Sequence, residues 1–309
     1  MAIRTLFLGS NHEALETLKV LNENKDFEIV GVITQPDKAV GRKKEVVETD
    51  IKKYCKKNNI VVFHTQGKKE KYREALDLFK PEINVCKSFG EKIPKFFLDF
   101  PKYKSINIHF SLLPKYRGAV PIQMAILNGD EYTGISIIKM SKDLDAGDIL
   151  AQYKGKIQKD DTNISLRERL VKKTAEILPK VLIKWTRGDI ELKKQDEKEV
   201  TFCFKEDVSK EKAKIDFEKQ TAEYIERMVR AFLPWPVAWI VINGKKAKLF
   251  KVKINKEKVL KPKEFLNKNH SLLIGCKKET IEIEKLQMEG KKEMEIKEFL
   301  NGIKVASIG

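Results

Sequence analysis

The amino-terminal residues alternate between strand and helix signals. Residues 4–8 are mostly apolar, which predicts a strand that ends at a turn beginning with Gly9. Residues 13–21 predict a helix, and residues 27–34 predict a second strand. Two strands joined through a helix pair in parallel with a right-handed crossover. The pattern therefore predicts an α/β domain with a mostly parallel sheet. A G-x-G-x-x-G fingerprint is missing, so dinucleotide binding is not supported.

The chain has 309 residues, which is more than one hydrophobic core usually supports. We therefore expect two domains. A polar, charge-rich stretch at residues 188–199 is a reasonable boundary. The predicted division is a catalytic domain at residues 1–188, a linker at 189–206 and a second domain at 207–309.

The second domain carries short apolar stretches separated by turns. Asn243-Gly244 is a strong signal for a β-hairpin. Several short strands with glycine turns are typical of a small barrel. The expected strands cover residues 238–242, 247–254, 271–276 and 280–284.

The chain is strongly basic, with a formal net charge of +17 and a pI near 9.4. Such a balance indicates a polyanionic partner, nucleic acid first. A lysine-rich composition also arises in AT-rich genomes, and charge alone leaves both explanations open. In the second domain, residues 245–278 contain twelve lysines but only two acidic residues, Glu257 and Glu264. This excess of positive charge predicts a positive face to which phosphates can bind. The lysines are Lys245, Lys246, Lys248, Lys251, Lys253, Lys256, Lys258, Lys261, Lys263, Lys268, Lys277 and Lys278.

The cysteines are far apart in the sequence, at Cys55, Cys86, Cys203 and Cys276. With no C-x-x-C pair and only four histidines, no zinc spacing is present and no metal is expected. The cysteines are predicted to be small buried residues in a reducing compartment. Residues 1–4 lead straight into a strand, and no apolar run is long enough for a bilayer, so we expect a cytoplasmic protein without a membrane partner.

A stretch of polar and apolar alternation begins at Ile106. In a strand, Asn107 and His109 share one face, and Pro114 ends the pairing soon afterwards. The acidic cluster at residues 143–148 follows another apolar strand, at residues 134–140. If these two strands are neighbours, a carboxylate comes within reach of the His109 imidazole.

Two interpretations of these polar residues are open. A single histidine beside a strand is usually structural, and an acidic turn is usually only a turn. A catalytic set of Asn107, His109 and Asp145 suits transfer of an acyl-like group to an amine. His109 relays the amine proton, Asn107 stabilises the oxyanion, and Asp145 orients the imidazole.

The motifs in this region resemble those of the folate-dependent formyltransferases. The chain reads N-x-H-x-SLLP-x-x-RG from Asn107, then P-I-Q-x-A, G-D-x-x-T-G and L-D-A-G-D. The resemblance covers nearly the whole chain and is greatest to the group that acts on methionyl-tRNA. It implies that Asn107, His109 and Asp145 are catalytic. It also implies folate contacts at Phe89, Gly90, Ser111, Leu112, Leu113 and Pro114.

The same resemblance implies a tRNA substrate. Members of the group carry a Q-P-D-x-x-x-G-R loop that reaches the acceptor stem, which here makes Arg42, Lys43 and Lys44 candidate contacts. Their carboxy-terminal domain is an OB-like barrel that contacts tRNA, and here it offers Lys246 and Lys248. The loop after Lys44 departs from the group's Pro-Ser-Pro-like segment.

The expected reaction moves a formyl group from 10-formyltetrahydrofolate to the α-amine of methionine on initiator tRNA. No covalent enzyme intermediate and no obligate protein partner are expected. The alternatives are formyl transfer to an amino sugar nucleotide, and a nucleic-acid-binding protein that has lost catalysis. Glycinamide ribonucleotide formyltransferases share the core motifs but do not need residues 206–309.

Overall fold

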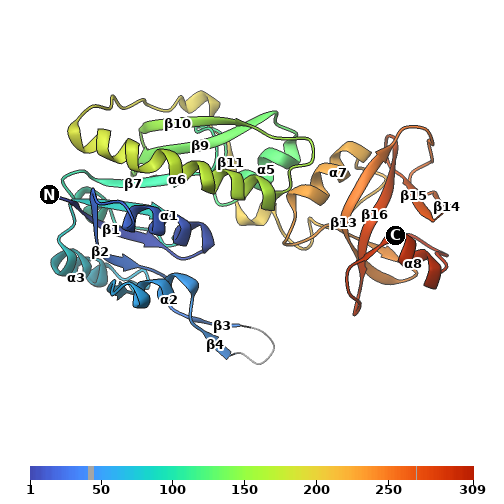
Figure 1. Ribbon diagram of the computed structural model, residues 1–309. Helices are drawn as coiled ribbons and strands as arrows, with labels where there is room; N and C mark the ends of the chain where they lie inside the picture. The colour runs from blue at the N-terminus through green and yellow to red at the C-terminus, as the bar shows by residue number, and fades with distance from the viewer. Residues whose placement is uncertain (41–44, 269) are drawn as a thin grey trace. The chain divides into compact units, whose positions relative to one another are not determined.

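The computed structural model describes residues 1–40, 45–268 and 270–309 (Figure 1). Its internal contacts divide the chain into two compact units. Unit 1 holds residues 1–117, 134–154 and 168–201. Unit 2 holds residues 118–133, 155–167 and 202–309. The predicted boundaries at residues 188 and 206 stay a prediction.

Unit 1 is built on a seven-stranded sheet in the order β10-β9-β7-β6-β1-β2-β5. The five strands from β7 to β5 are parallel, and β9 is antiparallel to β7. The mostly parallel α/β sheet predicted from the first strands is therefore confirmed. The strands are β1 (Ile3–Gly9), β2 (Phe27–Ile33), β5 (Val62–Phe63), β6 (Ile83–Lys87), β7 (Ser105–His109), β9 (Tyr132–Lys139) and β10 (Ile149–Lys156).

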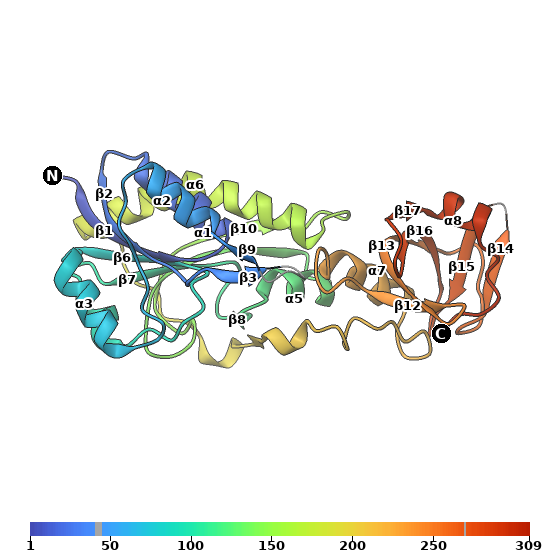
Figure 2. The ribbon, with the colours of Figure 1, turned by 90° about the horizontal axis from the view of Figure 1, so that it is seen from below.

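Helices cover both faces of this sheet. Figure 2 shows α1, α2 and α6 on one face and α3 on the other. With both faces covered, the parallel strands are rich in apolar residues, and β6 is buried at every position, its polar residues Asn84 and Lys87 included. The helices are α1 (His12–Asn22), α2 (Asp50–Lys57), α3 (Lys69–Phe79), α4 (Lys95–Asp99) and α6 (Asn163–Arg187); a small hairpin, β3 (Lys38–Val40) and β4 (Glu45–Val47), lies apart from the sheet.

Local sequence explains how these elements begin. The Asn11 side chain accepts a hydrogen bond from the Ala14 amide at 3.0 Å and so caps α1. Leu6 and Leu8 of β1 pack with Tyr72 and Phe79 of α3 in one buried cluster. All four cysteines are buried and free, as predicted. In the part of the chain that the structure describes, no helix has the length and apolarity that crossing a bilayer requires.

Unit 2 contains an antiparallel sheet in the order β12-β13-β16-β15-β14, with β17 paired to β16. The sheet curls into a small barrel-like form (Figure 1), which agrees with the predicted fold class. Asn243 and Gly244, at φ 50° and 74°, form the hairpin turn between β12 and β13 that the sequence predicts. The strands are β12 (Trp239–Ile242), β13 (Lys245–Asn255), β14 (Phe265–Lys268), β15 (Ser271–Gly275), β16 (Thr280–Met288) and β17 (Met294–Glu295).

Unit 2 also contains helices, and two segments from the middle of the sequence. Its α5 (Pro121–Asn128) packs against α7 (Ala222–Ala231), and α8 (Ile296–Gly302) packs against β15 and β16. The Arg227 Nε donates to the Leu127 carbonyl at 3.0 Å, and the Asn163 amide donates to the Leu233 carbonyl at 2.7 Å. These bonds join residues 70 to 100 positions apart, so the local sequence pattern could not predict them.

Candidate active site

Strand β7 places the first two candidate residues on one face. His109 is buried, with 5% of its surface exposed, and Asn107 is partly buried. Cys86 of β6 lies opposite Asn107, and Ser136 of β9 lies opposite His109. Because β7 pairs on both sides, the directions of its side chains are fixed by two hydrogen-bond ladders.

The loop between β9 and β10 supplies the carboxylate. Asp145 has φ 48°, in the left-handed region that Asp tolerates better than most residues. Gly147 lies so close to the Lys139 carbonyl that a Cβ would be 1.7 Å from its oxygen. Only glycine allows this approach. The loop is closed further by the Lys139 amide, which donates to the Asp148 carbonyl at 2.9 Å.

The structure brings the three residues together. The Asn107 Nδ2 donates to one oxygen of Asp145 at 3.1 Å, and the His109 Nδ1 lies 3.4 Å from the other. The His109 Nε2 lies 2.8 Å from the Tyr116 carbonyl. A carbonyl and a carboxylate can only accept, and the carbonyl is the nearer of the two, so we assign the proton of the neutral ring to Nε2. Nδ1 is then the basic nitrogen, and it faces the carboxylate.

The turn after β7 orients the Tyr116 carbonyl. Tyr116 has φ 61°, an uncommon value for a residue with a side chain. Its amide donates to the Thr201 hydroxyl at 2.8 Å, which holds the turn in place. We attribute the strained backbone to the need for an acceptor at His109 Nε2.

Two opposing effects act on the imidazole. Burial lowers the pKa of His109 below its ordinary value, because an imidazolium loses hydration in the interior. The Asp145 carboxylate and the Tyr116 carbonyl act in the opposite direction, and the positive charge of Lys87 adds to the lowering. The net result is a neutral ring at pH 7 that gains a stabilising partner when it accepts a proton.

The candidate folate residues after β7 form a firmly bonded turn. The Ser136 hydroxyl donates to the Ser111 carbonyl at 2.7 Å and accepts from the Leu113 amide at 3.0 Å. Leu113 is buried, whereas Leu112 and Pro114 are partly exposed. The latter two are the side chains of this turn that a ligand reaches most readily. Their folate role stays a prediction.

Phe89 and Gly90 follow strand β6. The Phe89 ring is 4% exposed and belongs to the core cluster beside α3. Gly90 has φ 83° with no atom within 4 Å of where a Cβ would lie, so the backbone conformation is what favours glycine here. Glu91 accepts hydrogen bonds from the Tyr72 and Thr65 hydroxyls at 2.9 and 2.6 Å. Folate contact at Phe89 and Gly90 stays a prediction.

A positioning residue was not predicted from the sequence. The Gln195 amide donates to the carbonyls of Asp145 and Gly147 at 2.8 and 2.7 Å, and so holds the turn that presents the carboxylate. The buried Arg117 donates to the Gln195 side chain at 3.0 Å and forms a two-point ion pair with Glu197. Arg117 belongs to the R-G part of the motif, but its partners lie about 80 residues away.

We expect Gln195→Ala to lower kcat about tenfold, because the Asp145 turn loses two hydrogen bonds and small displacements at a reacting site are costly. The free energy of unfolding should fall by about 1–2 kcal/mol. Gln195→Glu should behave alike, since its carboxylate cannot donate to two carbonyls. Steady-state kinetics and thermal denaturation test this. Wild-type turnover in both variants would show that the turn is held without Gln195.

The structure describes only some of the predicted tRNA contacts. Arg42, Lys43 and Lys44 lie outside the described residues. Lys246 and Lys248 lie on one face of β13 in unit 2, where the Lys246 ammonium is 3.9 Å from the centre of the Trp239 ring. Lys210 and Lys214 lie around the same tryptophan, through the Trp239 Nε1 bond to the Lys210 carbonyl and a 5.7 Å cation–π contact. We call Lys210, Lys214, Lys246 and Lys248 the tryptophan-side lysines.

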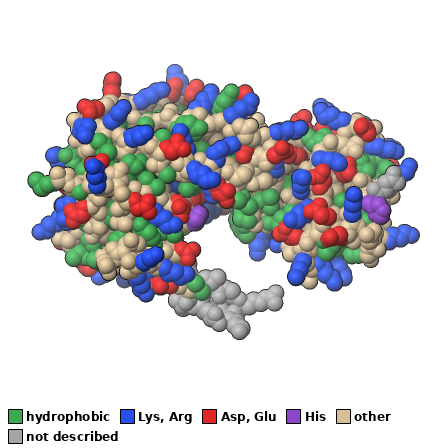
Figure 3. Space-filling view, viewed as in Figure 1, with side chains coloured by type: hydrophobic (Ala, Val, Ile, Leu, Met, Phe, Trp, Pro, Cys, Tyr) green, Lys and Arg blue, Asp and Glu red, His purple; other side chains and the backbone are tan. Residues whose placement is uncertain are grey.

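The expected unopposed positive face is wrong in part. Lys251 is paired with Glu284 at 2.9 Å, and Lys253 with Glu282 at 3.3 Å. These acidic residues lie on β16, beyond the span compared in the sequence, and antiparallel pairing brings them beside the lysines. On the face shown in Figure 3, acidic side chains are interspersed among basic ones. The tryptophan-side lysines have no ion pair with the described acidic residues.

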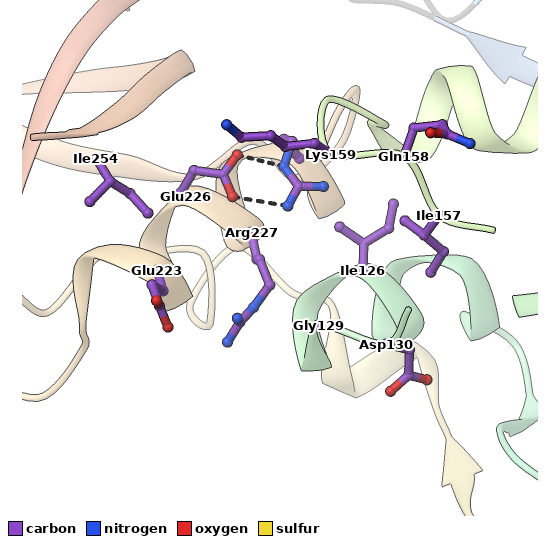
Figure 4. Close-up of a pocket in the computed structure, with 11 residues that line it drawn as sticks. Ile126, Gly129, Asp130, Ile157, Gln158, Lys159, Glu223, Glu226, Arg227 and Ile254 are labelled. Carbon is purple, nitrogen blue, oxygen red and sulfur yellow. Dashed lines mark hydrogen bonds and ion pairs between the residues drawn. The ribbon is translucent and has the colours of Figure 1, made fainter. Parts of the chain in front are cut away.

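A pocket of about 240 Å³ in unit 2 is separate from these residues (Figure 4). Arg230 is joined to Glu226 by two hydrogen bonds of 2.6 and 2.9 Å. The other charged residues that line the pocket are two basic ones, Lys159 and Arg227, and two acidic ones, Glu223 and Asp130, so their charges cancel. We assign the pocket no ligand. Among the described residues, no group of three or more His, Cys, Asp or Glu side chains is arranged to hold a metal ion.

Comparison with known proteins reveals the family. A sequence model of the formyl transferase family matches residues 3–182, and one of the formyl transferase C-terminal domain matches residues 207–304. A methionyl-tRNA formyltransferase of Sulfurihydrogenibium sp. (strain YO3AOP1) is 39% identical over 82% of this chain and 80% of its own. A methionyl-tRNA formyltransferase of Bacillus cereus (strain B4264) is 36% identical over 98% of this chain and 96% of its own.

Solved structures share the fold at lower identity. An N-formyltransferase from Helicobacter canadensis, in complex with folinic acid and dTDP-3-aminofucose, aligns with a TM-score of 0.69 over 94% of this chain and all of that one, at 20% identity. HypX from Aquifex aeolicus in complex with tetrahydrofolic acid aligns with a TM-score of 0.66 at 20% identity, and this chain spans about half of its length. The family match over more than half of the sequence, supported by the two close relatives, shows that the chain belongs to the formyl transferase family.

Proposed function

We propose that the chain transfers a formyl group from 10-formyltetrahydrofolate to the α-amine of methionine on initiator methionyl-tRNA, in the cytoplasm, for translation initiation. The family membership and the methionyl-tRNA formyltransferases that align over nearly the whole chain support the reaction and the substrate. The single observation that carries the chemistry is the contact of Asp145 with both Asn107 and His109.

The proposed reaction is an addition of the amine followed by elimination of the folate. The methionine amine attacks the formyl carbon, and its new C–N bond gives a tetrahedral intermediate. The amine proton passes to His109 at Nδ1, where Asp145 stabilises the imidazolium. The bond from the formyl carbon to the folate N10 then breaks, and His109 returns the proton to N10. No covalent bond to the enzyme is formed.

Asn107 suits stabilisation of the oxyanion. Its amide has two N–H bonds, and the hydrogen bond to Asp145 at 3.1 Å uses one of them. The other is available to a negative oxygen. The bond to Asp145 also fixes the amide, so little reorganisation is needed as charge develops.

Formyl transfer from 10-formyltetrahydrofolate to three acceptors tests the function. The acceptors are charged initiator tRNA, elongator methionyl-tRNA and an amino sugar nucleotide. Strong preference for the initiator is the expected result. Activity on the sugar alone would move the protein to the sugar N-formyltransferases, whose fold is also similar.

The tryptophan-side lysines predict a measurable tRNA interaction. We expect Lys246→Ala/Lys248→Ala to raise KM for tRNA about tenfold at low salt, with kcat nearly unchanged, because phosphate contacts supply affinity and not chemistry. The slope of log(kcat/KM) against log salt should become shallower by about 1–2.

The matched control lies on the same strand. In Lys251→Ala/Lys253→Ala the same number of charges is lost from β13, but Glu284 and Glu282 already neutralise these lysines. We expect a change in KM of less than about threefold. Equal effects of the two double variants would show that only total charge matters, and would remove the tryptophan-side lysines from the tRNA site.

A further inference from the structure

Lys87, the last residue of β6, is buried beside the candidate active site. Its side chain is 4% exposed, and it is the only lysine among the described residues that is buried. A buried ammonium is costly unless it is paired and hydrogen-bonded. Lys87 Nζ lies 3.2 Å from a carboxylate oxygen of Glu13 on α1, which is 5% exposed.

Two further contacts come from the segment that carries His109. Lys87 Nζ donates to the Ile108 carbonyl at 3.2 Å and lies 3.1 Å from the centre of the Phe110 ring. Ile108 and Phe110 flank His109 in the sequence, and Cys86 lies opposite Asn107 in the sheet. The ammonium is therefore held at the carboxyl ends of β6 and β7, beside the catalytic candidates. Charges are screened only weakly in such a buried position.

The charges at this edge influence one another. The ionisable groups around Lys87 are Glu13 on α1, Cys86 on β6, His109 on β7 and Asp145 in the loop before β10. The positive charge of Lys87 lowers the pKa of His109. Burial lowers the pKa of Lys87 itself to about 7, against the raising effects of Cys86 and Asp145. The Glu13 carboxylate at 3.2 Å favours the charged form of Lys87.

We propose that Lys87, fixed by Glu13, is a positioning residue that offsets the negative charge of Asp145 and so adds to the effect of burial in keeping His109 unprotonated until the substrate amine delivers its proton. Asp145 alone would favour an imidazolium before the reaction begins, and an imidazolium cannot accept a proton. The inference rests on the proposed function for its chemical meaning. Packing alone does not explain the pair, because apolar residues of similar volume fill such a position at least as stably.

The test removes both charges together. Glu13→Gln/Lys87→Met keeps the side-chain sizes and leaves no unpaired buried charge. The protonation of His109 is followed by NMR of protein that carries labelled histidine. The chain has four histidines, and the resonance that disappears in His109→Asn is the one from His109. We expect the His109 titration and the acidic limb of kcat/KM to move together to higher pH by about half a unit, a threefold loss on that limb.

Two variants frame this result. Lys71→Met/Glu74→Gln removes an exposed ion pair of 2.7 Å on α3 and should leave the titration unchanged. Lys87→Arg keeps the charge and should restore the wild-type profile. If the double variant does not fold, Glu13→Gln alone serves, since Lys87 without its counter-ion loses its proton more readily and the same charge is lost.

The titration is measured without substrate, which separates this inference from the proposed function. An unchanged His109 titration in the folded double variant would overturn the role of Lys87, whatever the enzyme formylates. A shifted titration would support it, even if the acceptor proves to be a different amine.

Discussion

Replacement of His109 by asparagine should lower kcat for formyl transfer by about three orders of magnitude, the usual size of a general acid–base contribution. Nδ1 of His109 is the basic nitrogen at the site, because Nε2 donates to the Tyr116 carbonyl. Asparagine cannot accept the amine proton. The KM for tRNA should change little, since the tryptophan-side lysines belong to another part of the chain. His12→Asn, at an exposed position, is the matched control.

The wild-type pH dependence follows from the same residue. Burial lowers the pKa of His109 below 6.5, and the neutral form is the base. Activity should therefore be full above that pKa and fall as pH decreases through it. Near-normal turnover of His109→Asn, or an acidic limb that persists in that variant with the same midpoint, would exclude His109 as the base.

Asp145→Asn should lower kcat by about two to three orders of magnitude. The variant keeps the volume, and its side-chain oxygen can still accept from Asn107, but it no longer stabilises the imidazolium. Its amide would also donate to Nδ1 and occupy the basic nitrogen. Because the Asp145 charge raises the pKa of His109, its loss should move the acidic limb to lower pH. This is opposite to the shift expected for Glu13→Gln/Lys87→Met.

The control for this variant lies in the same loop. Asp148 forms an ion pair of 3.0 Å with Lys139 and is 30% exposed. Asp148→Asn should change kcat by less than about threefold, because a partly exposed pair contributes little. Single-turnover measurements distinguish a chemical defect from slow product release. A loss in Asp148→Asn as large as in Asp145→Asn would mean that the loop, and not the Asp145 carboxylate, is what matters.

Local sequence determined the parts of this protein that depend on short-range regularity. The apolar run of β1, the alternation at residues 106–109 and the Asn243-Gly244 turn each require only neighbouring residues, and each forms as predicted. Period-two patterns settle which face a side chain takes, and Asn107 and His109 lie on one face for that reason. The ordered motifs around them were sufficient to indicate the family.

Some elements were missed or incomplete. The strands β14 and β17 are short, and β14 carries polar residues, so neither has a clear alternating pattern. Helix α8 has seven residues, which is too short for a helical period to be distinguished. Strand β16 continues to Met288, beyond the predicted end at residue 284. These elements are stabilised by packing on the sheet and not by intrinsic preference.

Only the tertiary structure decided the electrostatics of the site. The Gln195 bonds to the Asp145 turn and the Lys87–Glu13 pair join residues that are 50 to 74 positions apart in the sequence. The left-handed backbone at Asp145 depends on a close backbone approach in its turn. In the same way β16 brings Glu282 and Glu284 beside lysines that appear unopposed in the sequence. Charge interactions depend on distance and burial, and both are set by the fold and not by the order of residues.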